Sequence, residues 1–348
     1  MAILGRYGAV FGSVLIRCVL LLSATSVTAV EEEGANSTGV DDFDDMSVVL
    51  TPARINQPYK DSPMSVTVIT GEKIRALGIR RIPEALRLVP GMVVASASDF
   101  DYRIAYQAGV GQQPRRIQVL VDGVPMYFGG LSRVKWGTFP ITVNEISRIE
   151  VIRGPNASSY GANSFSAVVN IMSKTPSQSL GLEIGGYTGA RGDEEARFSY
   201  ARRLRNTSVQ LNGFYIHGDG FDENFEGNDR RDDTQVETIR LRTETDFENN
   251  GVLSLSVAYV DAVLEAEFAD EDQLTFPDID SEDLFLSGEW KVSGSDHSDW
   301  RMFGSYTRSE VIRDWRTCPL NLNYTPELIA LFEGNIRYVN DLNSGLIP

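Results

Sequence analysis

The stretch RIEVIRGPNASSYGANSFSAVVNIMSK, residues 148–174, reads as a strand, a tight turn, a small polar patch and a second strand. It has no His and no Cys, and Glu150 is its only acid. The glycines before Pro155 and after Tyr160 predict turns that place the backbone close against a wall. The stretch is distinctive, yet it carries little of the equipment that catalysis requires.

Mixed α/β character surrounds this stretch over residues 63–176. Residues 64–70 alternate like a strand, and residues 82–91 predict a short helix that ends at Pro-Gly. Residues 116–127 predict two strands joined by a tight Asp122-Gly123 turn. Together these elements predict one compact α+β domain.

After residue 176, alternation of period two replaces helical periodicity. In residues 238–247, apolar side chains and Thr take every second position, and the positions between them are charged: Arg240, Arg242, Glu244 and Asp246. The segments 252–259, 284–292 and 300–307 show the same alternation. An apolar outer face with a wet inner face predicts a transmembrane β-barrel. A soluble antiparallel sheet with one wet face gives the same pattern.

The connections between these strands favour the barrel. The turn at 249–251 is short, whereas 219–233 and 261–283 are predicted to be long acidic loops. Short turns at one end and long loops at the other are typical of outer-membrane barrels.

The N-terminus predicts export. Basic residues precede an apolar run at 18–29 that ends in small side chains, so residues 1–29 read as a cleavable signal peptide. A buried or anchoring helix is the alternative, although the run is short for a membrane span. Residues 30–45 are acidic and predict a flexible tether.

Composition excludes other classes of protein. The net charge of −16 argues against nucleic acid as a partner, because phosphate binding needs a cationic face. With only two His, metal sites and His-based catalysis have little support. The sequence therefore predicts no cofactor, no metal site and no enzymatic activity; an exported enzyme would have to work with scattered carboxylates.

Several blocks of the sequence, in the same order, resemble the plug domain of TonB-dependent outer-membrane receptors. The blocks are SVTVIT at 65–70, IPEALRLVPGMVV at 82–94, IQVLVDGVPMY at 117–127 and ISRIEVIRGPNASSYGANSFSAVVNIMSK at 146–174. The resemblance covers about residues 47–174.

The resemblance implies an α+β plug domain at 55–176, followed at 177–348 by antiparallel transmembrane β-barrel strands, about seven of them. It implies structural roles within the plug for nine residues: Asp122, Gly123, Arg148, Glu150, Arg153, Gly154, Pro155, Tyr160 and Gly161. Because a plug that fills a polar lumen needs charged partners, Arg148 and Arg153 are predicted to pair with lumen carboxylates such as Glu244 or Asp246. The alternative for Arg153 is a solvated strand end.

Residues 46–54 resemble the TonB box, the segment that pairs with the periplasmic energy-transducing protein TonB. A β-prone strand on a flexible tether can add to the edge of a partner's sheet. The predicted TonB contacts are Ser47, Val48, Val49, Leu50 and Thr51. The alternative is that these residues form only the first strand of the plug.

The family implies energy-coupled uptake of a scarce extracellular ligand across the outer membrane of a Gram-negative bacterium. A ferric siderophore or a similar chelate is the expected ligand, and haem, cobalamin and sugars are other ligands of the family. Plug loops at 96–106 and 127–136 are predicted to face it, with contacts from Tyr102, Tyr106, Tyr127, Phe128, Arg133 and Trp136.

The chain departs from the family in length. Plugged transporters have about 22 strands, which need about 220 residues to cross the membrane, whereas 174 residues follow Lys174. The expectation is a C-terminally truncated chain whose Cys318 is half of an extracellular-loop disulfide, or else a lone free thiol. A non-transporting plug-based periplasmic binding module, or a decayed gene product, is the alternative function.

Overall fold

The computed structural model describes most of the chain between residues 65 and 313. The described residues are 48–49, 57–58, 65–96, 98, 100–107, 116–128, 133–161, 163–189, 192–221, 232–248, 250–265, 278–293 and 299–313.

A five-stranded sheet forms the centre of the plug, in the order β3-β10-β11-β6-β7. β10 pairs antiparallel with β3 and with β11, whereas β6 joins β11 in parallel. The two predicted strands of the 148–174 stretch are thus the central pair of this sheet. The bounds are β3 (Ser65–Thr70), β6 (Ile117–Val121), β7 (Val124–Pro125), β10 (Ile146–Arg153) and β11 (Ala167–Ser173).

Short helices and small strand pairs surround the central sheet. The Thr70 hydroxyl accepts a hydrogen bond from the Lys73 amide (3.2 Å), which caps the first of these helices. The helices are α2 (Gly71–Ala76), α3 (Ile82–Ala85), η2 (Leu86–Leu88), η3 (Trp136–Thr138), η4 (Val143–Glu145), α4 (Ala157–Tyr160) and η5 (Pro176–Gln178). The strand pairs are β1 (Val48–Val49) with β2 (Gln57–Pro58), β4 (Met92–Ser96) with β5 (Tyr102–Tyr106), and β8 (Tyr127–Phe128) with β9 (Arg133–Val134).

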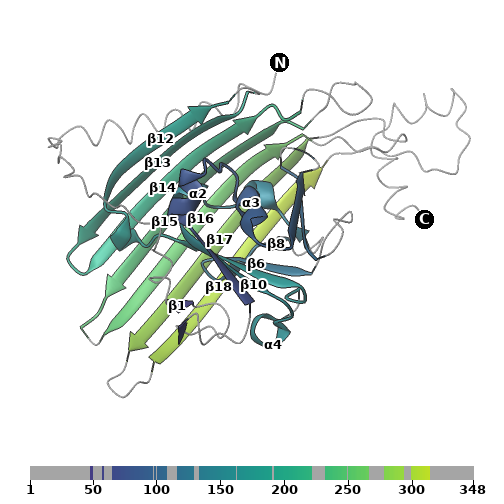
Figure 1. Ribbon diagram of the computed structural model, residues 1–348. Helices are drawn as coiled ribbons and strands as arrows, with labels where there is room; N and C mark the ends of the chain where they lie inside the picture. The colour runs from purple at the N-terminus through teal and green to yellow at the C-terminus, as the bar shows by residue number, and fades with distance from the viewer. Residues whose placement is uncertain are drawn as a thin grey trace, which may run out of the picture. The chain divides into compact units, whose positions relative to one another are not determined.

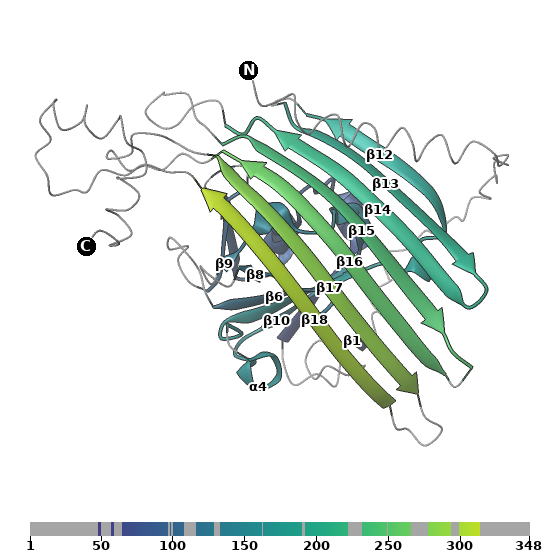
Figure 2. The same ribbon diagram turned by 180° about the vertical axis from the view of Figure 1, so that it is seen from behind.

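A second sheet of seven antiparallel strands follows the plug in strict sequence order. It curves past the plug elements, which lie on one of its faces (Figures 1 and 2). The strands are β12 (Gly181–Thr188), β13 (Glu194–Leu204), β14 (Thr207–Gly218), β15 (Thr234–Asp246), β16 (Gly251–Leu264), β17 (Ile279–Ser293) and β18 (Asp299–Arg313).

The connections alternate in length as predicted, but one predicted loop is wrong in extent. β16 runs to Leu264 and β17 begins at Ile279, so much of 261–283 is strand. Three of the acids that suggested a loop, Asp261, Asp280 and Glu282, take outward positions, with Asp261 directly opposite Glu282 across the strand pair, whereas Asp283 points inward and is buried. The alternation of inward and outward residues continues through these acids. The sequence was interpreted as a loop because the segment is so acidic.

The two faces of the second sheet carry the predicted side chains. Ile239, Leu241, Leu255 and Val257 are exposed on the outer face, whereas Arg240, Arg242 and Glu244 of β15 point inward. The inner face is not polar throughout. Near the longer connections, which join β14 to β15 and β16 to β17, lies what we call the long-loop end of the sheet. There the inner face carries a buried apolar cluster, against which Phe100 of the plug packs; its members are Phe214, Val236, Val260, Ala262, Leu264 and Ile279. The predicted fold class, an α+β plug followed by antiparallel barrel-type strands, is confirmed.

Among the residues that the structure describes, no helix is both long enough and apolar enough to cross a membrane.

The plug glycines act through backbone conformation, which corrects the prediction that they approach a wall. Gly154 and Gly161 have φ of 104° and 75°, in the left-handed region that favours glycine. No described atom lies within 4 Å of where a Cβ would stand at either position. The close approach is at Gly123 (φ 85°), where a Cβ would meet the Phe303 ring of β18 at 3.2 Å.

This difference predicts unequal costs for two substitutions. Gly154→Ala should lower stability by about 1 kcal/mol, because only the left-handed conformation is penalised. Gly123→Ala should lower it further, because its methyl group also meets Phe303. The midpoint of thermal unfolding of the purified protein measures both. Equal midpoints for the two variants would contradict the close approach at Gly123.

Candidate functional site

An ionic contact joins the plug to the inner face of β15. Asp122 lies in the turn between β6 and β7, where its φ of 48° and the positive φ of Gly123 define a type I′ turn. Arg240 Nη2 donates to Asp122 Oδ2 over 2.6 Å, and Arg242 Nη2 lies 3.9 Å from the same oxygen. The Ser173 amide (2.8 Å) and hydroxyl (2.6 Å) also donate to this carboxylate.

The contact between Asp122 and Arg240 is largely buried, and we call it, together with its immediate neighbours, the anchor. The Arg240 side chain is 4% exposed and that of Asp122 is 22% exposed, so water screens the pair weakly. Burial raises the pKa of Asp122, but Arg242, Arg240 and the hydrogen bonds from Ser173 outweigh that effect. The pKa of Asp122 therefore lies well below its usual range, and the carboxylate is charged at neutral pH.

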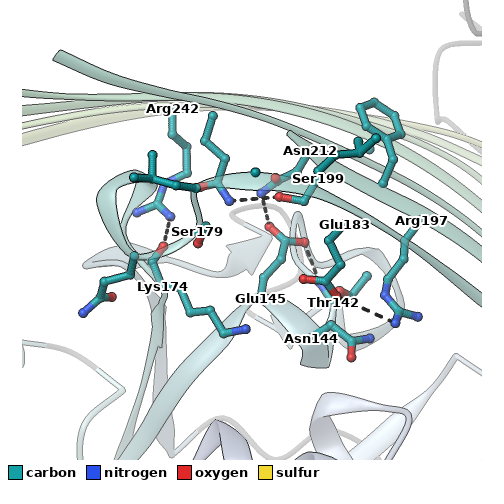
Figure 3. Close-up of a pocket in the computed structure, with 17 residues that line it drawn as sticks. Thr142, Asn144, Glu145, Lys174, Ser179, Glu183, Arg197, Ser199, Asn212 and Arg242 are labelled. Carbon is teal, nitrogen blue, oxygen red and sulfur yellow. Dashed lines mark hydrogen bonds and ion pairs between the residues drawn. The ribbon is translucent and has the colours of Figure 1, made fainter. Parts of the chain in front are cut away.

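Glu145, in η4, forms a second contact with the seven-stranded sheet, which we call the wall. Its Oε1 accepts from the Thr142 amide (3.1 Å), and its Oε2 accepts from Asn212 Nδ2 of β14 (2.6 Å; Figure 3). Arg240 Nη1 lies 3.9 Å away. Burial raises the pKa of Glu145, and its positive and hydrogen-bonding neighbours offset only part of that rise. The two plug acids therefore have opposite pKa shifts beside the same arginine.

A polar cavity of about 210 Å³ lies beside Glu145, between the plug and strands β12–β15 (Figure 3). Three buried polar atoms around it have no hydrogen-bond partner among the described residues: Gln210 Oε1, Asn212 Oδ1 and Arg197 Nε. Polar atoms in a cavity of this size bind ordered water. Within the described part of the chain, no cluster of three or more His, Cys, Asp or Glu is placed to hold a metal ion.

The plug arginines do not form the predicted ion pairs. Arg148 pairs with Glu150 on its own strand (2.7 Å), and Arg153 hydrogen-bonds to the Ser65 hydroxyl. The predicted partners are used elsewhere, because Ser177 donates to Glu244 (2.5 Å) and Arg203 pairs with Asp246 (2.8 Å). Around Asp122 the signs are reversed from the prediction: the plug supplies the acids and the wall supplies the arginines.

The predicted ligand contacts with described side chains pack in the plug. Tyr102 and Trp136 line one small cavity of about 40 Å³, and Trp136 is 9% exposed beside Phe139. The Tyr106 ring covers Gly91, and the Tyr127 hydroxyl donates to the Ile117 carbonyl. Burial raises the pKa of Tyr127 to about 12. Phe128 and Arg133 pair through their backbones, and their side chains lie outside the described part. The ligand assignment stays a prediction.

Two other predicted sites lie largely outside the described residues. Of the TonB-box-like residues, only the backbones of Val48 and Val49 are described, and they pair with Pro58 and Gln57. Ser47, Leu50, Thr51 and Cys318 are not described. Their roles remain predictions.

Sequence reasoning missed most of the anchor. It placed Arg240 and Arg242 on the wet face, but it did not identify Glu145, Asn212 or Ser173 as their surroundings. The available signal was the charge on alternate positions of β15, which predicts a charged partner without saying which one.

Comparison with known proteins shows what the chain resembles. Residues 58–168 match the TonB-dependent Receptor Plug Domain family. The chain is 28% identical over 205 residues to the vitamin B12 transporter BtuB of Vibrio vulnificus, a match that covers 58% of this chain and 31% of the transporter. The predicted resemblance is confirmed: the chain carries the plug domain of TonB-dependent receptors and, after it, antiparallel strands like those of their barrels.

Solved structures show the same fold. The alcaligin outer-membrane receptor FauA of Bordetella pertussis matches with a TM-score of 0.59 at 17% identity, over 76% of this chain and 42% of that one. The ferric yersiniabactin uptake receptor FyuA of Yersinia pestis matches with a TM-score of 0.59 at 14% identity, over 77% and 43%. The chain thus spans about a third of the curated relative and about two fifths of these structures.

Removing the anchor charge should loosen the plug. Asp122→Asn leaves Arg240 buried beside a neutral group, which should cost about 3 kcal/mol. The matched control is Asp246→Asn, whose pair with Arg203 is about half exposed and should contribute less than about 1 kcal/mol. Hydrogen exchange of β6 and β11 in outer-membrane vesicles measures the effect. Equal protection in both variants would contradict the anchor.

The opposite pKa shifts predict opposite pH effects. The folded pKa of Asp122 lies below the unfolded value of about 3.9, so its contribution is present above that pH and is lost as pH falls toward the folded pKa. The folded pKa of Glu145 lies above its unfolded value, so protonation as pH falls favours the folded plug.

We therefore expect Asp122→Asn to abolish the loss of plug protection below about pH 4. Glu145→Gln should keep or raise stability at pH 7. It removes a charge that burial disfavours, because it replaces the carboxylate with a neutral amide of the same shape. Urea titrations of both variants from pH 3 to pH 7 test this. A larger loss at pH 7 for Glu145→Gln than for Asp122→Asn would be the contrary result.

Proposed function

We propose that this chain acts in a TonB-dependent outer-membrane receptor that imports a scarce extracellular ligand by energy-coupled transport. The seven described strands would supply part of the barrel wall, with their apolar face toward lipid and their charged face toward the plug. A cleavable signal peptide at 1–29 would direct export.

The observation that carries the proposal is the anchor of Asp122 and Glu145 on Arg240 and Asn212. It holds the plug sheet against the inner face of the wall by a few short, specific polar contacts. Contacts of this kind are strong against thermal opening when buried, and they weaken sharply once separation admits water. Such an interface suits a plug that is stable at rest and yields to a directed pull.

The pull would be transmitted through residues 47–51, at which TonB would add a strand by main-chain hydrogen bonds. Val48 and Val49 supply the β-prone centre of this segment. The backbones of these two residues pair with Pro58 and Gln57, and an extended backbone is what strand addition requires.

The ligand would be a metal chelate of the kind that similar receptors take up. The relatives are described as receptors for alcaligin and ferric yersiniabactin and as a vitamin B12 transporter. We favour a ferric siderophore, with cobalamin as the second candidate, and with contacts in the plug loops at 96–106 and 127–136.

Deleting residues 47–51 from the receptor should abolish uptake and leave ligand binding intact, because the segment transmits energy and does not contact the ligand. Uptake of ⁵⁵Fe-labelled catecholate and hydroxamate siderophores and of ⁵⁷Co-cyanocobalamin would be measured in a host that lacks its own receptors.

The matched control is deletion of residues 36–40, an equal length of the predicted tether, which should retain uptake. Full energy-dependent uptake after loss of residues 47–51 would refute the TonB-box assignment. Binding without energy-dependent uptake by the unaltered receptor would favour a non-transporting binding role.

A further inference from the structure

A second buried ion pair, between Lys135 and Asp283, joins the plug to the wall. The Lys135 ammonium contacts both carboxylate oxygens of Asp283, at 2.7 and 2.6 Å. It also donates to the hydroxyls of Ser281 and Ser309, each at 2.9 Å. Ser281 and Asp283 lie on β17, and Ser309 lies opposite Asp283 on β18.

The charged and hydroxyl groups of this network form hydrogen bonds with one another. An ammonium has three donors, and here they face one carboxylate and two hydroxyls. Ser309 and Ser281 in turn donate to the two oxygens of Asp283, the latter at 3.4 Å. Asp283 is 1% exposed and Lys135 is 16% exposed. Loss of either charge would leave the other buried without its partner, which is strongly unfavourable.

The position of Lys135 links three parts of the molecule. It directly follows β9 (Arg133–Val134) and directly precedes η3, whose Trp136 is buried in the plug core. β9 pairs with β8 (Tyr127–Phe128). One residue therefore ties the β8–β9 hairpin to the wall strands, while its neighbour ties the same segment to the plug core.

We propose that Lys135 is a positioning residue: its ion pair with Asp283 fixes the paired strands β8 and β9 against β17 and β18, and so orders them for ligand binding. The part that concerns the ligand rests on the proposed function. Lys135 does not itself touch the ligand. It limits the orientations of the paired strands β8 and β9. The conformational entropy that ordering them costs is therefore lost when the protein folds and not when the ligand binds.

Hydrogen exchange of the complete receptor in outer-membrane vesicles tests the anchor without any ligand. Lys135→Met and Asp283→Asn should each speed amide exchange across residues 127–138 by about tenfold or more, with β3 and β10 unchanged. Lys135→Arg should stay near the unaltered receptor, and the double variant Lys135→Asp with Asp283→Lys should recover part of the protection. Lys291→Met, which breaks the more exposed pair with Glu289, is the matched control.

Unchanged exchange at 127–138 in Lys135→Met would overturn the proposal. If Lys135→Met or Asp283→Asn fails to reach the membrane, the charge-swapped variant decides: recovery of assembly supports the pair, and failure alongside an assembled Lys135→Arg overturns it.

Uptake kinetics test the positioning role, with whichever labelled probe the unaltered receptor takes up from the catecholate, hydroxamate and cobalamin set. Lys135→Met should raise the half-saturating concentration about tenfold and change the maximal rate little. A fall in maximal rate alone would overturn the positioning role. If the unaltered receptor takes up none of the probes, the proposed function fails, and hydrogen exchange still decides the anchor.

Discussion

A charge buried between the plug and the wall must have a partner, and this constraint organises the structure. Arg240 is almost fully buried on the inner face of β15, where an unpaired guanidinium would be costly. Asp122 meets it because a type I′ turn projects its carboxylate beyond the sheet, and Gly123 leaves room for Phe303 beside that turn. The Asp122-Gly123 turn therefore depends on two strands of the wall: on β15 for the partner of Asp122, and on β18 for the ring that packs beside Gly123.

Among the residues that the structure describes, the ionic contacts between plug and wall have both polarities. At Asp122 and Glu145 the plug supplies the acids, whereas at Lys135 the plug supplies the cation and Asp283 the acid. Complementary charges of both signs specify one orientation of the plug more strongly than charges of one sign, because a rotated plug would oppose like charges. The cavity near Glu145 is lined largely by polar side chains, which makes this interface easier to separate than an apolar core.

The second sheet separates two environments by alternation alone. Outward side chains such as Leu241 and Val257 remain exposed in the described sheet, while their strand neighbours contact the plug. Toward the long-loop end the inner face becomes apolar and packs against Phe100. The plug is thus held toward this end by hydrophobic contact together with the Lys135–Asp283 pair, since Asp283 lies directly opposite Val260 of the cluster, and elsewhere by the pair of Asp122 and Arg240.

The sequence by itself determined the strands, their faces, the turn at Asp122-Gly123 and the class of the plug, because these depend on local periodicity and on residues that favour positive φ. It also placed Arg240 and Arg242 on the inner face. Only the tertiary structure decided their partners, since any acid on the plug surface satisfies the same local pattern. The predicted pairs of Arg148 and Arg153 were wrong for that reason, and Lys135 gave no local sign of its role: which charges meet depends on how two sheets distant in sequence are packed, and no period in the chain encodes it.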